Sequence, residues 1–151
     1  MDIYDYLKMD HSKVSALFKQ FNKAPNKRKG EIANLIADEL LAHAKSEEET
    51  FYKAIEQHAE SKDEVLHGWK EHQEIENLIK TIDNHEVNVQ SLTNKIEKLE
   101  KLVDHHVKEE ERKIFRKAKK VLSSEQTYAL KELMHDLKHQ WLIKRQKDKP
   151  C

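Results

Sequence analysis

The sequence contains little that would interrupt a helix and almost nothing that would cross-link the chain. Only two glycines and two prolines occur in 151 residues, while Lys, Glu, Leu, Ala and Gln dominate. Glycine and proline are the usual breakers of regular structure, and the abundant residues are good helix formers. We therefore expect long amphipathic helices. The one cysteine, Cys151, has no partner for an intramolecular disulfide, which fits a reducing compartment.

The sequence also lacks an excess of charge of either sign. It has 28 Lys plus Arg and 28 Asp plus Glu. Nucleic acids and anionic membrane surfaces attract basic proteins, so neither is expected as a partner. No apolar run approaches the length that spans a bilayer, and no signal peptide opens the chain. These absences predict a cytoplasmic protein, and the length predicts a single domain over residues 1–151.

Apolar residues recur at helical spacing in five stretches of the chain. They predict helices over about residues 3–23, 27–57, 62–83, 88–121 and 124–144, followed by a charged tail at 145–151. Asp2 and Ser61 are candidate N-caps, and Ser123 with Gln126 forms a capping-box pattern before the last helix. The fold class is therefore predicted to be all-α.

Histidine is in clear excess, with 10 copies, and it is the commonest transition-metal ligand. Two histidines stand four residues before a glutamate, in His43-x-x-x-Glu47 and His106-x-x-x-Glu110. Positions i and i+4 lie on one face of a helix, one turn apart, so each pair can bind a common metal ion. The two motifs are 63 residues apart.

A second pair of similar segments has nearly the same separation. Residues 10–19 (DHSKVSALFK) and 71–80 (EHQEIENLIK) share an acidic residue followed by histidine, then a branched apolar residue, a leucine and a lysine. His11 and His72 are 61 residues apart. A repeat of this kind implies two similar helix hairpins around an approximate twofold axis. The predicted architecture is an antiparallel, up-down four-helix bundle with an additional C-terminal helix.

Six of these polar residues fall on the apolar, core-facing stripes of the first four helices. They are His11, His43, Glu47, His72, His106 and Glu110. Unpaired carboxylates are costly to bury, so the set predicts a metal site. The simplest layout has two ions, each bound by two histidines, with both carboxylates bridging and with positions left open for a small ligand. Mixed ligation in a bundle core favours non-haem iron, although imidazole also suits other divalent metals.

At these residues the sequence resembles the hemerythrin-like HHE cation-binding family. The family pattern is a histidine on the first helix, His-x-x-x-Glu on the second, histidine on the third and His-x-x-x-Glu on the fourth, and the six residues match it over about residues 1–122. The resemblance implies a cofactor of two iron ions (Fe2+/Fe3+) bridged by oxo or hydroxo. It also implies binding of dioxygen, or a response to oxygen, nitric oxide, peroxide or iron.

One departure from the oxygen-carrying members lies on the third helix. Those proteins have a histidine four residues before the position of His72, where this chain has Gly68. His67 is adjacent in sequence but about 100° around the helix. The missing histidine argues against simple oxygen carriage. Tyr4, Glu39 and Glu76 lie on suitable faces and are candidates either for an additional metal ligand or for hydrogen bonding to the ligands.

Other histidines do not join the predicted site. His135 and His139 form a possible zinc pair on the last helix, but their charged neighbours favour a solvated face. His105 points about 100° away from His106. Trp69, three residues before His72, either lines the metal pocket or belongs to the core.

Three functional hypotheses follow. The first is a di-iron protein that binds or senses a small molecule such as dioxygen, nitric oxide or peroxide at a buried centre. The second is an enzyme with ferroxidase, peroxidase-like or nitric-oxide-reducing activity at the same centre. The third is a structural or interaction module with zinc or no metal. Whether the protein is an enzyme stays open at this point, and the sequence indicates no particular protein partner.

Overall fold

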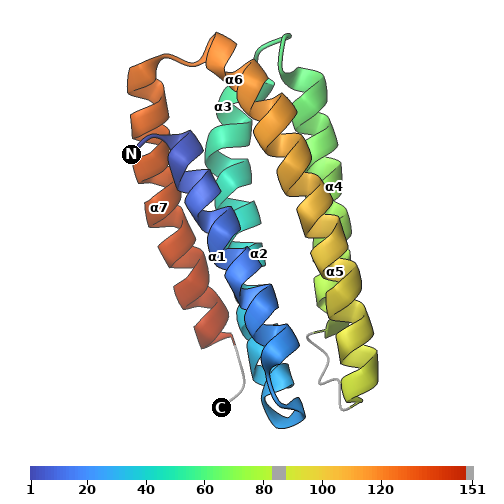
Figure 1. Cartoon of the computed structure of the whole chain (residues 1–151). Helices are drawn as coiled ribbons and strands as arrows, with labels where there is room; N and C mark the ends of the chain where they lie inside the picture. Colours follow the sequence, from blue (N-terminus) through green and yellow to red (C-terminus); the bar gives the residue numbers. More distant parts are fainter. Residues whose placement is uncertain (83–87, 149–151) are drawn as a thin grey trace.

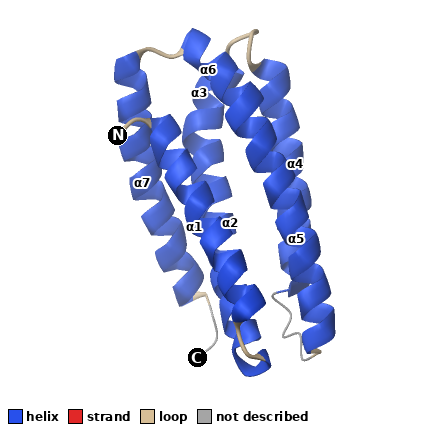
Figure 2. Ribbon diagram, viewed as in Figure 1, coloured by secondary structure: helices blue, strands red, loops and turns tan. Residues whose placement is uncertain are grey.

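The structure is a computed structural model that describes residues 1–82 and 88–148. All regular structure in these residues is helical, as Figure 2 shows, so the prediction of an all-α fold is confirmed. The elements are α1 (Ile3–Lys23), α2 (Asn26–Glu47), η1 (Glu48–Tyr52), α3 (Lys53–Glu56), α4 (Lys62–Ile82), α5 (Val89–Glu109), η2 (Glu110–Ile114), α6 (Phe115–Val121) and α7 (Ser124–Lys147). Within the described residues, no helix is both long enough and apolar enough to cross a membrane.

The helices form two antiparallel hairpins that lie side by side (Figure 1). The first hairpin pairs α1 with α2, and α2 runs without a break through η1 into α3. The second pairs α4 with α5, which continues through η2 into α6. The remaining helix, α7, packs along the outside of α1 and α2. The structure is thus a four-helix bundle with one additional C-terminal helix.

The sequence signals at most helix ends act as expected. The Asp2 side chain accepts a hydrogen bond from the backbone N–H of Asp5, and Ser123 with Gln126 forms the predicted capping box. Ser61 differs, because its hydroxyl donates to the carbonyl oxygen of Ile55 and so stabilises the end of the preceding helix. Helix α7 continues to Lys147, past the expected end at residue 144. The expected end of the third helix at residue 83 and the tail residues 149–151 fall outside the described residues.

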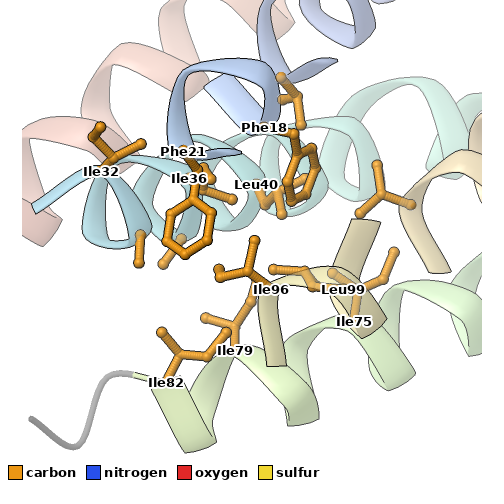
Figure 3. Close-up of a cluster of buried hydrophobic side chains, with 14 of the residues drawn as sticks. Phe18, Phe21, Ile32, Ile36, Leu40, Ile75, Ile79, Ile82, Ile96 and Leu99 are labelled. Carbon is orange, nitrogen blue, oxygen red and sulfur yellow. The ribbon is translucent and has the colours of Figure 1, made fainter. Parts of the chain in front are cut away.

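Two apolar clusters fill the bundle on either side of a polar layer. The larger one lies between the two hairpins toward the α1–α2 turn and is shown in Figure 3. Its members include Phe18, Phe21, Ile36, Leu40, Ile75, Ile79, Ile96 and Leu99. The other surrounds the start of α1 together with η1, α3, η2 and α6, and includes Ile3, Leu7, Phe51, Ile55, Ile114 and Phe115. On α1, His11 lies between Leu7 of one cluster and Val14 of the other, so it belongs to the layer between them.

Both hairpins contain a π-helical turn at equivalent places. One, η1, follows directly after Glu47, and the other, η2, begins at Glu110. A π turn adds one residue to the helical turn and rotates the residues beyond it, and such turns often occur at functional sites. The turns therefore change which residues after each glutamate face the bundle interior.

Helix α7 docks through a more polar face than its leucines suggest. Lys138 and Met134 are buried, whereas Leu133 is 55% exposed. Leu35 on α2 is likewise 48% exposed, although it stands at helical spacing from buried apolar residues such as Ile32 and Ile36. The inward face of α7 carries a lysine because acidic side chains of α1 and α2 lie beneath it. Apolar periodicity alone does not identify such a face.

Candidate metal centre

The polar layer contains all six residues of the predicted site. Their ligand atoms form two groups, in each of which all atoms lie within 4.8 Å of one another. One group consists of Glu47, His72, His106 and Glu110, and the other of His11, His43 and Glu110. Each hairpin contributes two histidines to one group, while Glu110 belongs to both. Glu47 also approaches the second group, because its Oε1 lies 3.6 Å from Nε2 of His43.

Within each hairpin, the residue that precedes one histidine orients the other. Asp10 Oδ2 lies 2.8 Å from Nδ1 of His43 on the paired helix. In the second hairpin, Glu71 Oε1 lies 2.8 Å from Nδ1 of His106. Burial opposes ionisation of both carboxyls, but their histidine partners outweigh it and lower the pKa of Asp10 and of Glu71. Both residues are therefore carboxylates that accept a hydrogen bond from Nδ1–H.

Between the hairpins, the residue that follows each glutamate orients the remaining histidine. Glu48 Oε2 lies 2.8 Å from Nδ1 of His72, and Glu111 Oε2 lies 2.6 Å from Nδ1 of His11. All four imidazoles thus have a carboxylate on Nδ1. Partners of this kind fix the orientation of metal-binding histidines and raise their basicity.

This arrangement directs lone pairs toward one another. A carboxylate only accepts, so each Nδ1 carries the proton and each Nε2 presents a lone pair in the neutral imidazole. The Nε2 atoms of His72 and His106 are 3.0 Å apart. The Nε2 atoms of His11 and His43 and both oxygens of Glu47 are buried without a hydrogen-bond partner. Converging acceptors need cations, so these residues fit divalent metal ions.

Without metal, protons occupy part of this layer. Burial alone would lower the pKa of His11, but its contacts with the carboxylates of Glu110 and Glu111 outweigh burial and raise the pKa to about 9. For His106, hydrogen bonds to Glu110 and Glu71 outweigh burial and raise the pKa to about 10. These two imidazoles therefore hold protons that compete with metal.

The remaining four residues of the layer are His43, His72, Glu47 and Glu110, and their pKa values shift in different directions. Burial lowers the pKa of His43 and of His72, despite the carboxylates on their Nδ1 atoms. Burial and the charge of Glu110 raise the pKa of Glu47 well above its ordinary value. The pKa of Glu110 is lowered, because its contacts with histidines outweigh burial. Glu110 is thus the more permanent anion, which suits its membership of both ligand groups.

Tyr52 occupies the place of the missing fifth histidine. Its ring stacks on His72 with centroids 5.1 Å apart, and its hydroxyl donates to Oε2 of Glu110 over 2.5 Å. A Cβ atom at Gly68 would lie 2.7 Å from that hydroxyl. Burial, followed by the charge of Glu110, raises the pKa of Tyr52 well above its ordinary value, so the phenol stays protonated. A histidine at position 68 could not coexist with this placement of Tyr52.

The sequence did not single out Tyr52, because it stands five residues after Glu47. In a regular α-helix that spacing points about 140° away from the glutamate. The π turn η1 includes Tyr52 and brings it onto the inner face. An aromatic residue five positions after Glu47 could have indicated this contact. It does so only if the helix is known to contain a π turn at this point.

None of the three additional candidates belongs to the two ligand groups. Tyr4 packs against Phe51 and Phe115 in an apolar cluster. Glu39 forms ion pairs with Lys138 at 2.9 Å and with Lys13 at 3.0 Å. Glu76 pairs with Lys45 at 3.3 Å. Lysines therefore neutralise both glutamates, and Tyr4 faces apolar residues.

Trp69 is 37% exposed, and its ring lies 6.3 Å from that of Tyr52, so it borders the site from outside.

A buried lysine connects α7 to the site. Lys138 Nζ donates to Oδ1 of Asp10 over 2.8 Å, and the other oxygen of Asp10 accepts from His43. Lys138 is 6% exposed, although lysine is rarely buried unless it is paired. The additional helix thus holds the carboxylate that orients one histidine of the site.

An apolar cavity of about 30 Å³ adjoins the four histidines. Side chains such as Leu40, Ile75 and Val103 form its remaining wall. A groove on the outer surface between α1 and α5 shares His11 and Val103 with this cavity. The cavity has room for a molecule of a few atoms and has little polar surface.

Comparisons with known proteins agree with this geometry. The family model described as "Hemerythrin HHE cation binding domain" matches residues 2–118. A protein named DNA nickase from Nostoc sp. (strain PCC 7120) is 31% identical over 129 residues, which are 84% of this chain and 36% of that protein. The chain therefore spans little more than a third of the relative's length. No solved structure matches.

Proposed function

Because this chain belongs to the hemerythrin HHE cation-binding family, we propose that it is a non-haem di-iron protein that binds or senses dioxygen, nitric oxide or peroxide. The residues that would hold the metal are His11, His43, Glu47, His72, His106 and Glu110. Iron would supply electron exchange with a small ligand at positions that these side chains leave open.

The observation that carries this proposal is the concentration of buried acceptors without donors. Both oxygens of Glu47, together with Nε2 of His11 and of His43, lack a hydrogen-bond partner. Each such atom would cost free energy on burial unless a cation balanced it. The division into two ligand groups that share Glu110 supports two ions rather than one.

The surroundings of the centre support a small, weakly polar ligand. The adjoining cavity measures about 30 Å³, so it has room only for a molecule of a few atoms. Apolar side chains exclude bulk water from it and therefore disfavour large or charged substrates. The hydroxyl of Tyr52, which donates to Glu110, is a neutral proton donor beside the two ligand groups.

Anaerobic reconstitution with ferrous iron tests the proposal. We expect two iron atoms per chain by elemental analysis, and a new near-ultraviolet absorption band when air is admitted. Two variants, His43→Ala and Glu110→Ala, are each expected to lose at least one iron. Wild-type protein that binds no iron would refute the proposal. Zinc without iron at the six buried residues, shown by its loss in His43→Ala and Glu110→Ala, would instead favour a structural module.

The second candidate is an enzyme at the same centre, with ferroxidase, peroxidase-like or nitric-oxide-reducing activity. The buried Tyr52 hydroxyl favours it, because a neutral donor 2.5 Å from Glu110 can deliver a proton that bond cleavage in peroxide or dioxygen requires. Turnover separates the candidates. An oxygen or peroxide electrode would record catalytic consumption for an enzyme and a single stoichiometric uptake for a binding protein.

The name DNA nickase belongs to the Nostoc relative, and the matched region makes up 36% of that protein. This chain has 28 basic and 28 acidic residues, so it has no basic excess for binding phosphates. We therefore place its function at the buried centre. A supercoiled-plasmid assay with iron-loaded protein, with His43→Ala as control, would show nicking if this region shares the relative's activity.

A further inference from the structure

Asp10 and Glu71 occupy equivalent places in the two hairpins, but the outer oxygens of their carboxylates have different partners. The outer oxygen of Asp10 accepts from Lys138 of α7 at 2.8 Å. The outer oxygen of Glu71, Oε2, lies 3.3 Å from Nε2 of His67 and 3.4 Å from Nε2 of His105. A lysine thus neutralises one carboxylate, whereas two imidazoles from α4 and α5 face the other.

The two imidazoles are accessible, unlike those of the centre. The side chains of His67 and His105 are 57% and 66% exposed, and that of Glu71 is 11% exposed. They border a surface groove of about 510 Å³, whose lining also includes Asp63, Glu64, Glu109 and Lys113, and Lys113 pairs with Glu109 at 3.1 Å. Ions in solution can therefore reach both imidazoles, and three acidic residues against one lysine in the lining favour cations.

We propose that His67, His105 and Glu71 Oε2 form a surface site for a divalent transition-metal ion such as Zn2+, separate from the buried centre. Two imidazoles and one carboxylate are a common protein ligand set for zinc, with water in the remaining position. His67 and Glu71 are at i and i+4 on α4, which places them on one face. Both histidines are largely exposed, so their rings can turn to complete the site.

The proposed site contacts the centre through one side chain. Glu71 Oε1 accepts from Nδ1 of His106, while Oε2 lies beside the two imidazoles that line the groove. A cation on Oε2 withdraws negative charge from the carboxylate and weakens its hold on the Nδ1 proton of His106. The surface ion therefore modulates the basicity of a residue in the buried centre. This consequence rests on the proposed function, whereas zinc binding itself does not.

The other exposed pair of neighbouring histidines is less suited to a metal ion. The rings of His135 and His139 on α7 are 4.5 Å apart, but Nδ1 of His135 is hydrogen-bonded to the hydroxyl of Tyr6 at 3.3 Å. This pair is unchanged in every protein of the test below, so any zinc that it binds cancels.

Titration calorimetry with Zn2+ alone tests the site. The variants are His67→Ala/His105→Ala and the single His105→Asn, with His58→Ala as the control because His58 is exposed and outside the groove. We expect both test variants to bind one zinc fewer per chain than wild type, and His58→Ala to bind the wild-type number. Far-UV circular dichroism should be the same for all four proteins.

Test variants that bind as many zinc ions as wild type would overturn the proposal, and so would an equal loss in His58→Ala. The outcome is independent of the buried centre, because His11, His43, Glu47 and Glu110 are unchanged in all proteins. For iron-loaded protein, zinc should shift the near-ultraviolet band in wild type but not in His67→Ala/His105→Ala. An identical shift in both would contradict the contact through Glu71.

Discussion

The phenol oxygen of Tyr52 lies 2.5 Å from Oε2 of Glu110, the carboxylate that belongs to both ligand groups. Replacing Tyr52 with Phe removes the hydroxyl and keeps the ring that stacks on His72. We expect two iron atoms to remain bound. If the centre consumes peroxide, the rate should fall about 100-fold, the usual effect of losing a positioned proton donor. An unchanged rate in the peroxide electrode would exclude Tyr52 as that donor.

Gly68 is required because Tyr52 fills the space next to it. A Cβ at this position would lie 2.7 Å from the Tyr52 hydroxyl and 3.1 Å from a methyl carbon of Ile114. We expect Gly68→Ala to lower the free energy of unfolding by about 1–3 kcal/mol, the usual cost of overpacking. Gly30→Ala is the matched control, since nothing lies within 4 Å of its Cβ, and it should stabilise α2 by up to about 1 kcal/mol. Urea unfolding of both variants measures the difference, and similar changes in the two would refute this account of Gly68.

Much of the candidate metal centre could be predicted from the sequence because its residues recur with fixed spacing. The i, i+4 spacing of His43 with Glu47, and its repeat 63 residues later, places two chelating pairs on helix faces. The apolar neighbours of these pairs direct them into the core. Local periodicity is therefore sufficient for the side chains that point at the centre.

Residues whose position depends on a helical irregularity or on tertiary contact could not be predicted in this way. Tyr52 reaches the site only through the π turn η1, which has no clear sequence signal. Lys138 has the appearance of a solvent-facing residue in sequence, yet it is buried between Asp10 and Glu39. The ion pairs of Lys138 with Asp10 and Glu39 join residues more than 90 positions apart in the sequence. The spacing of residues within one helix does not predict such long-range contacts.

Glu48 should affect metal affinity without contacting the metal. Its carboxylate accepts from Nδ1–H of His72 at 2.8 Å. Glu48→Gln keeps an acceptor but removes the charge that makes the imidazole more basic. We expect the affinity for zinc or ferrous iron to fall about 10-fold at the site that includes His72. Glu49→Gln, at an exposed neighbouring position, controls for the loss of one negative charge. Equal affinities of the two variants in competition with a chelating dye would contradict this role of Glu48.

Lys138 should stabilise both the docking of α7 and the orientation of His43. Lys138→Met keeps much of the side-chain volume but leaves the carboxylates of Asp10 and Glu39 without their buried cation. Removal of one partner from such a group typically costs about 3–5 kcal/mol. Chemical unfolding should show a loss of that order, whereas the exposed Lys144→Met should change stability little. Lys138→Met is also expected to weaken metal binding, and wild-type values of both quantities would show that this ion pair is dispensable.

Metal affinity should rise with pH. Burial alone would lower the pKa of His11 and His106, but their hydrogen bonds to carboxylates outweigh it and raise the values to about 9 and about 10 in metal-free protein. Metal must displace these protons, so its apparent affinity increases as pH rises toward those values. Calorimetry at about pH 6 and pH 8, in buffers that differ in protonation enthalpy, should show tighter zinc binding at the higher pH and release of protons to the buffer. Affinity independent of pH would mean that neither imidazole is protonated before metal binds.

Removal of the metal should leave the bundle folded but less stable. Two apolar clusters flank the polar layer, and each large side chain that they bury contributes about 1.5–3 kcal/mol without any ion. Burial and the charge of Glu110 raise the pKa of Glu47, so in metal-free protein this carboxyl takes up a proton at a higher pH than an ordinary glutamate does, which relieves the burial of an unpaired anion. Treatment with a chelator should therefore lower Tm while far-UV circular dichroism retains most of the helical signal. Collapse of that signal at room temperature would show instead that metal is required for folding, as in a structural zinc site.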